Sequence, residues 1–154
     1  MSRAFVKESD GAEGEELPEL LLSPHRNLVT PTGQRQIEAT VERLQSALSV
    51  ARAAEDRADV ARVQRDLRYW TARLRTAEVV AVTAATDTVR FGSAVTLEKQ
   101  DRERVEYQIV GEDEADPARG TISYVSPIAR LLMGTSVGDS LALADGMAIV
   151  VSIG

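Results

Sequence analysis

The sequence predicts an α+β protein, in which an N-terminal antiparallel coiled-coil hairpin of two α-helices precedes a small antiparallel β domain with one short helix. Two observations predict this fold class. Between Ile37 and Ala77, apolar residues recur alternately every three and every four positions, which is typical of helices that pack along a narrow seam. From residue 88 onward the period changes to two, which is typical of strands with one buried face.

The first helix is expected to begin at Thr30-Pro31-Thr32-Gly33, because a hydroxyl side chain can cap free backbone N–H groups and proline fits a first helical turn. Two seams follow, and we expect them to face each other in a finger about 30 Å long. Its tip is expected near residues 54–59. The seam positions are Ile37, Val41, Leu44, Leu48 and Ala51 in the first helix, and Val60, Val63, Leu67, Trp70, Leu74 and Ala77 in the second.

The β domain is expected to contain three strands, then a short helix, then two more strands. Ser126-Pro127 begins the helix and Gly134 ends it, and Asp145-Gly146 is a two-residue link typical of a β-hairpin. The first three strands fall within residues 88–99, 104–112 and 121–125.

We expect three parts in the chain. Residues 1–27 are rich in Glu, Pro, Gly and Ser and show no sustained period, which predicts a flexible N-terminal tail. Residues 28–79 form the finger, and residues 80–154 form the β domain.

Composition excludes several classes of function. The chain has no cysteine and a single histidine, His25, so disulfides, thiol catalysis and multi-histidine metal sites are excluded. No apolar run reaches the roughly 18 residues of a membrane span, and the N-terminus lacks the apolar centre of a signal peptide. We therefore expect a cytoplasmic protein without a membrane partner.

The net charge of −6 is unevenly distributed. Residues 33–79 carry nine arginines against seven acidic residues, whereas the segments on either side are acidic. This pattern does not suit a general duplex-DNA binder. It favours a protein whose two parts face different partners.

Residues 107–134, YQIVGEDEADPARGTISYVSPIARLLMG, resemble the C-terminal domain of the bacterial Gre transcript cleavage factors. Members of that family carry Tyr-x-Ile-Val-Gly-x-x-Glu-Ala-Asp and then Ile-Ser-x-x-Ser-Pro-Ile-Ala-Arg-x-Leu-x-Gly. Upstream, VRFGSAVTL and LVTPTGQRQIEATVERL resemble the first strand of that domain and the opening of the family's first long helix. The resemblance covers residues 28–154.

The resemblance implies an FKBP-like C-terminal domain and a partner, bacterial RNA polymerase. The domain would dock on the rim of the polymerase's secondary channel while the finger enters the channel. A metal site is not expected in the acidic stretch from Glu112 to Asp116, which lacks the oxygen spacing of a calcium loop. A solvated hairpin is one interpretation of this stretch, and docking is the one we favour. The expected docking residues are Glu114, Asp116, Ser123, Ser126, Pro127 and Arg130.

The finger tip departs from the family pattern. Cleaving members resemble Gly-Asp-Leu-x-Glu-Asn-x-x-Tyr, whereas this chain has AAEDRADVARV, with Glu55, Asp56 and Asp59 as its acids. The resemblance implies that tip acids help to hold Mg²⁺ at the polymerase active site, and here Asp56 and Asp59 are favoured. The other interpretation is that these acids cap the second helix and favour its dipole. We expect no cofactor beyond a Mg²⁺ ion shared transiently with the polymerase.

The arginines that follow the tip have two interpretations. They could face the 3′ end of the nascent RNA, because the arginine fork suits phosphate, or they could pair with acidic residues on the flanks of the coiled coil. Both interpretations stay open for Arg57, Arg62, Arg65 and Arg68.

The predicted function is regulation of transcription elongation by a monomer that binds polymerase and is not itself an enzyme. Whether it modulates backtracked complexes by stimulating cleavage stays open. One alternative is a regulator like Rnk, a Gre-like protein with a short finger, which occupies the channel or binds another partner. Another is a prolyl isomerase, which needs an aromatic pocket, but residues 80–154 contain only three aromatic residues, Phe91, Tyr107 and Tyr124.

Overall fold

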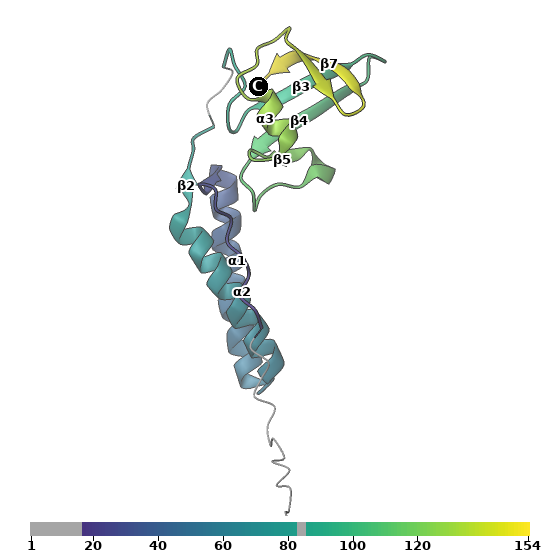
Figure 1. The fold of residues 1–154 in the computed structure, drawn as a ribbon. Coiled ribbons are helices and arrows are strands. Elements are labelled where there is room, and N and C mark those ends of the chain that lie inside the picture. The colour runs from purple at the N-terminus through teal and green to yellow at the C-terminus, as the bar shows by residue number, and fades with distance from the viewer. Residues whose placement is uncertain (1–16, 83–85) are drawn as a thin grey trace, which may run out of the picture.

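Two long helices form a finger that projects from a small β domain (Figure 1). The computed structural model describes residues 17–82 and 86–154. Helix α1 spans Pro31–Ala53, and α2 spans Arg57–Thr76. A short parallel pair of strands, β1 (Leu28–Val29) before α1 and β2 (Glu78–Val79) after α2, closes the base of the finger. The predicted helical hairpin is confirmed.

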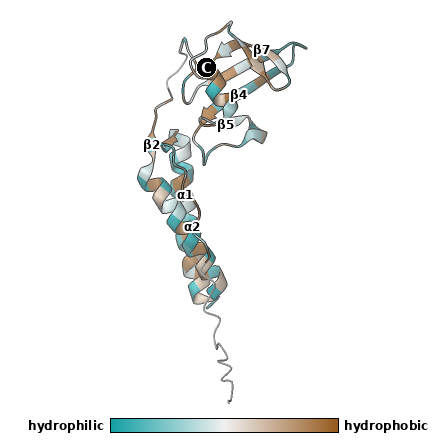
Figure 2. Cartoon of the chain, viewed as in Figure 1, coloured by the Kyte–Doolittle hydropathy of each residue, from teal (hydrophilic) through white to brown (hydrophobic). Residues whose placement is uncertain are grey.

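The two predicted seams pack against each other along the finger. Every predicted seam position of α1 is buried. On α2, Val63 is buried against Leu44 and Leu48, and Leu67 and Trp70 are partly buried in the same cluster. Figure 2 shows that hydrophilic residues occupy much of the remaining surface of these helices. A narrow seam of this kind gives an elongated hairpin, because neither helix has a second apolar face to bury.

The helices are joined by a tight turn that contains neither glycine nor proline. The N–H of Asp56 bonds to the carbonyl of Ala51 at 3.1 Å, and the N–H of Glu55 bonds to that of Arg52 at 3.1 Å. This pair of bonds is the Schellman arrangement, in which a left-handed residue ends a helix. Glu55 is that residue, with φ of 54°. The tip therefore lies within the predicted range.

The β domain is a five-stranded sheet with the order β5-β4-β3-β7-β6. Helix α3 (Pro127–Leu132) packs on it through Ala129 and Leu132, which are fully buried with Val95, Ile109 and Val150. The strands are β3 (Ala94–Lys99), β4 (Arg104–Val110), β5 (Thr121–Ser123), β6 (Ser140–Leu143) and β7 (Gly146–Ile153).

The sheet differs from the predicted one in two details. Strand β5 runs parallel to β4, because residues 111–120, which include the 3₁₀ helix η1 (Pro117–Arg119), carry the chain back along β4 before β5 begins. The final hairpin turns at Ala144 and Asp145, one residue earlier than predicted, since Leu143 pairs with Gly146. All the other pairs in this sheet are antiparallel, as expected.

The N-terminal segment from residue 17 to residue 27 follows the finger instead of forming a free tail. Glu19 pairs with Arg68 of α2 at 2.5 Å, and Arg68 lowers the pKa of Glu19 by hydrogen bonding to it. At the other end, Asn27 is buried against Arg73. The predicted tail over residues 1–16 lies outside the described residues. No helix of the described part of the chain is both long enough and apolar enough to cross a membrane.

Candidate functional site

Two of the three predicted acids at the finger tip have structural partners. Asp56 caps α2, because its carboxylate accepts the backbone N–H of Asp59 at 3.1 Å. Asp59 pairs with the guanidinium of Arg62, and this contact raises the pKa of Arg62. Glu55 is exposed, and its carboxylate has no hydrogen-bond or ion-pair partner within residues 17–82 and 86–154. Nowhere in those ranges do three or more His, Asp or Glu side chains gather in a way that could hold a metal ion.

Three of the four predicted basic residues of α2 are paired with acids. Arg62 contacts Asp59, Arg65 contacts Asp66 at 2.8 Å, and Arg68 contacts Glu19. Of these three pairs, only that of Arg65 involves an acid expected on the flank of the coiled coil, Asp66, because Asp59 lies at the tip and Glu19 in the N-terminal segment.

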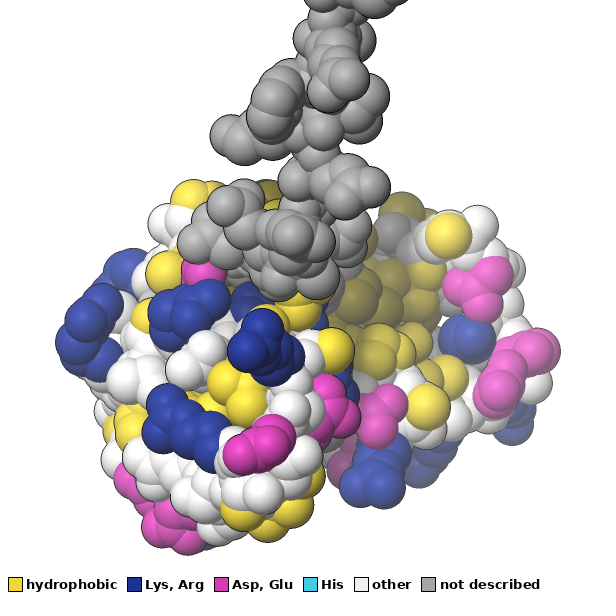
Figure 3. Space-filling view, turned by 90° about the horizontal axis from the view of Figure 1, so that it is seen from below, with side chains coloured by type: hydrophobic (Ala, Val, Ile, Leu, Met, Phe, Trp, Pro, Cys, Tyr) yellow, Lys and Arg dark blue, Asp and Glu magenta, His cyan; other side chains and the backbone are white. Residues whose placement is uncertain are grey.

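Arg57 is the first residue of α2, at the tip itself. Figure 3 shows several basic side chains, all of them arginines in this part of the sequence, on the end of the finger. A shallow hollow of about 600 Å³ opens there. It is lined by Arg52, Glu55, Arg57, Val60, Ala61 and Gln64. Arg52 was not singled out from the sequence, because it stands one position beyond the end of a seam.

On the β domain, four of the predicted docking residues gather at the start of α3. Ser126 caps this helix by accepting the N–H of Ala129, as expected. The neighbouring Ser123 accepts the N–H of Val125 at 3.3 Å and so shapes the preceding turn. Pro127 and Arg130 are exposed beside them. These side chains form a small surface on the domain, here called the α3 surface: Ser123, Ser126, Pro127 and Arg130.

The other two predicted docking residues lie elsewhere. Asp116 is exposed, caps η1 and is 3.5 Å from Arg119. It lines a hollow between the domain and the start of α1, together with Glu114. The Glu114 carboxylate points at that helix, with Oε1 2.5 Å from Thr30 Oγ1. The structure therefore divides the predicted docking set into the α3 surface and a second group beside the finger base.

The acidic stretch mostly contacts the chain itself. Glu112 bonds to Ser23 of the N-terminal segment at 2.9 Å. Asp113 accepts hydrogen bonds from Tyr69 Oη at 2.8 Å and from Arg73 Nε at 2.5 Å. Burial, together with the bond to Asp113, raises the pKa of Tyr69 to about 12. Sequence reasoning missed this network, because Arg73 and Tyr69 read as polar positions flanking the seam.

The fold and these surfaces define a class of protein in which a small α+β domain carries a helical finger with a charged tip. Residues 84–149 match the sequence model of a family described as transcription elongation factor GreA/GreB, C-terminal. The transcription elongation factor GreA of Rhodospirillum rubrum is 35% identical over 133 residues, which are 73% of this chain and 85% of that protein. The chain belongs to the GreA/GreB family.

Other relatives match over a shorter span. GreA of Vibrio parahaemolyticus is 49% identical over 82 residues, which are 51% of this chain and 50% of that protein. GreA of a Chelativorans species is 54% identical over 65 residues, which are 41% of each chain. The crystal structure of GreA factor homolog 1 of Thermus thermophilus covers 84% of this chain and 99% of its own, with 25% identity and a TM-score of 0.40.

Proposed function

We propose that this protein regulates bacterial transcription elongation by binding RNA polymerase at its secondary channel. The C-terminal domain docks on the rim through the α3 surface and Asp116, and the finger enters the channel. Family membership and the names of the relatives, which are transcription elongation factors, support this proposal. A finger of 20 to 23 residues per arm reaches about 30 Å beyond the domain, long enough to act at a distance from the docking surface.

The geometry of the tip carries the mechanistic part of the proposal. Asp56 caps α2 and Asp59 pairs with Arg62, so the tip does not present this pair of carboxylates freely. The cap fixes the orientation of the Asp56 carboxylate, and the Arg62 cation beside Asp59 repels a second metal ion at that place. We therefore propose that the protein acts mainly by occupying the channel. Any Mg²⁺ at the tip is shared transiently with the polymerase, and Glu55 is the acid free to approach it.

In this proposal the protein is a cytoplasmic monomer. It acts by filling the channel and by placing charged side chains there, and it catalyses no reaction of its own. This proposal is the Rnk-like alternative, in which the protein occupies the channel without stimulating cleavage. The second candidate is a factor that stimulates cleavage, which shares the docking step and differs in that the RNA is shortened.

Docking is tested by measuring the affinity of the cognate polymerase for the parent chain and for an Arg130→Ala, Pro127→Ala double variant. These residues are exposed and cap no helix, so the fold should persist. We expect the affinity to fall by about tenfold or more, as for other central contacts of an interface.

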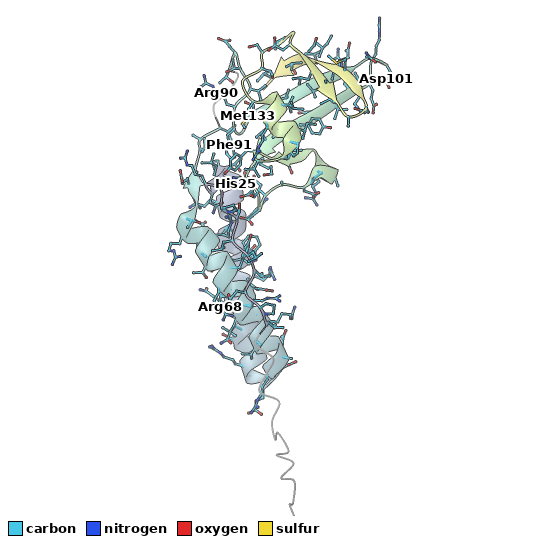
Figure 4. The ribbon with its side chains drawn as sticks, viewed as in Figure 1. His25, Arg68, Arg90, Phe91, Asp101 and Met133 are labelled. Carbon is cyan, nitrogen blue, oxygen red and sulfur yellow. The ribbon has the colours of Figure 1, made fainter. Side chains whose placement is uncertain are left out.

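Asp101→Ala is the control, since Asp101 lies at the far end of the domain from the finger (Figure 4). Equal affinities for parent and double variant would contradict the docking surface. A pull-down that retains another protein but no polymerase subunit would favour a different partner.

A further inference from the structure

The finger meets the β domain in a buried polar network, here called the joint, defined by Asn27, Thr30, Gly33, Tyr69, Arg73, Asp113 and Glu114. These residues come from three separate segments: the N-terminal segment with α1, the end of α2, and the loop after β4. A connection between two domains is often a mobile linker. Here the contacts are instead specific and largely hidden from water.

Arg73 is the centre of the joint. Its side chain is 4% exposed, and its Nε lies 2.5 Å from an oxygen of Asp113, which is 10% exposed. The other end of the guanidinium donates to Asn27 Oδ1 at 2.8 Å, while Asn27 Nδ2 donates to the Arg73 carbonyl at 2.7 Å. Tyr69 donates to the second oxygen of Asp113. One buried cation thus holds the β domain, the finger and the N-terminal segment in a fixed geometry, because an arginine fork bonds only in defined directions.

Glu114 makes a second contact, at the opposite helix. One carboxylate oxygen accepts the hydroxyl hydrogen of Thr30. The other is buried with no hydrogen-bond partner within the described residues. It lies so close to Gly33 that a Cβ on this residue would be 2.5 Å from it. A glycine in the first turn of α1 lowers helix propensity, but it admits a carboxylate to the positive end of the helix, where negative charge is favoured.

The backbone also approaches closely at this place. A Cβ on Gly111 would be 2.4 Å from the carbonyl oxygen of Leu28, so the loop after β4 touches the strand that precedes α1. The Tyr124 hydroxyl bonds to the carbonyl of Arg26 on the same strand segment. With the two side-chain contacts, this gives the joint attachments on both helices and on the segment that precedes α1. Attachments on three separate segments restrain the movement of the finger relative to the domain.

We propose that the joint sets the finger at one angle to the β domain, and that Asp113 and Glu114 are positioning residues for the finger rather than contacts with an outside partner. The consequence rests on the proposed function: once the domain docks, the joint decides where the finger tip lies in the channel. Loss of the joint leaves docking intact and removes the effect of the finger.

The test measures the distance between finger and domain directly. The chain has no cysteine, so Ser46→Cys and Gln100→Cys place spin labels only at two exposed sites, one on α1 and one on the domain. We expect one narrow distance in the parent and a broad distribution in Asp113→Ala. Gly33→Ala is a second variant whose new Cβ evicts Glu114 while favouring the helix, and it should also broaden the distribution. Asp101→Ala, on the far side of the domain, should leave the distance narrow.

The same variants are then added to cognate elongation complexes. We expect Gly33→Ala to bind polymerase with an affinity within about twofold of the parent and to lose the parent's effect on transcription. A narrow, unshifted distance in both joint variants would overturn the inference. If the parent chain does not bind polymerase, the proposed function is contradicted instead. The distance measurement would still decide the role of the joint.

Discussion

Arg73 and Asp113 lie 40 residues apart in the chain and form an ion pair in which neither side chain is more than a tenth exposed. Removing one partner of such a pair leaves the other charge buried, with neither an ion-pair partner nor water to solvate it. We expect Arg73→Met to lower the free energy of unfolding by about 3 kcal/mol or more. Chemical denaturation, followed by far-UV circular dichroism, measures the loss.

The matched control for this change is Arg26→Met. Arg26 pairs with Glu78 at 2.5 Å, but the two side chains are 73% and 48% exposed. A solvated pair contributes little to stability, so the control should unfold close to the parent. Equal losses in the two variants would mean that the Arg73 pair is not effectively buried.

The cap of α2 predicts a smaller effect at the finger tip. Asp56→Ala removes the acceptor for the Asp59 N–H and should cost about 1 kcal/mol of stability, whereas Asp56→Ser keeps a capping oxygen and should cost much less. Thermal unfolding of the three proteins checks the order. If the Asp56→Ala and Asp56→Ser variants were equally stable, Asp56 would have no capping role, and its carboxylate would be free to bind another group.

The left-handed backbone at Glu55 predicts a stabilising substitution. Glu55 has φ of 54°, a conformation that glycine adopts without steric cost. Glu55→Gly should therefore raise the free energy of unfolding by about 0.5 to 1 kcal/mol. Its neighbour Ala54 is right-handed, so Ala54→Gly should do the opposite. A loss of stability in both variants would show that the turn does not hold Glu55 in this conformation.

The raised pKa of Tyr69 predicts that the protein loses folding stability at alkaline pH. Its pKa rises from 10.0 to about 12 in the fold, mainly through burial. Above the lower value the unfolded chain releases a proton that the folded chain keeps, so stability is complete below pH 10 and falls as the pH rises toward 12. Between about pH 9 and about pH 11, the parent should lose more stability than Tyr69→Phe, as measured by denaturant unfolding. Parallel losses would contradict the raised pKa.

Much of the fold was predictable because it depends on periodic apolar burial. The seam from Ile37 to Ala51 and the caps at Thr30 and Ser126 are local patterns, and each appears as expected. The reversal of β5 was not predictable in this way. It depends on the path of a ten-residue loop, residues 111–120, whose ends do not reveal the direction of the next strand.

The joint was beyond the reach of sequence patterns for a different reason. From the sequence, the acidic stretch that holds Asp113 and Glu114 was interpreted as a docking surface or a solvated hairpin, and only the fold brings Arg73 and Gly33 to these two acids. Gly33 in the first turn of a helix was a usable signal. Glycine lowers helix propensity, so its presence there indicates that another group approaches the backbone too closely for a side chain.

The central claim is that the protein occupies the secondary channel of RNA polymerase with a tip at which two of the three acids, Asp56 and Asp59, are held in structural contacts. The most direct measurement is RNA cleavage in stalled, backtracked complexes of the cognate polymerase, with binding confirmed in the same samples. An Asp56→Ala, Asp59→Ala double variant and Glu55→Gln are run alongside. We predict binding with little shortening of the RNA in the parent and in both variants. Efficient shortening that the parent supports and the double variant loses would contradict the claim, because Asp56 and Asp59 would then serve the cleavage chemistry.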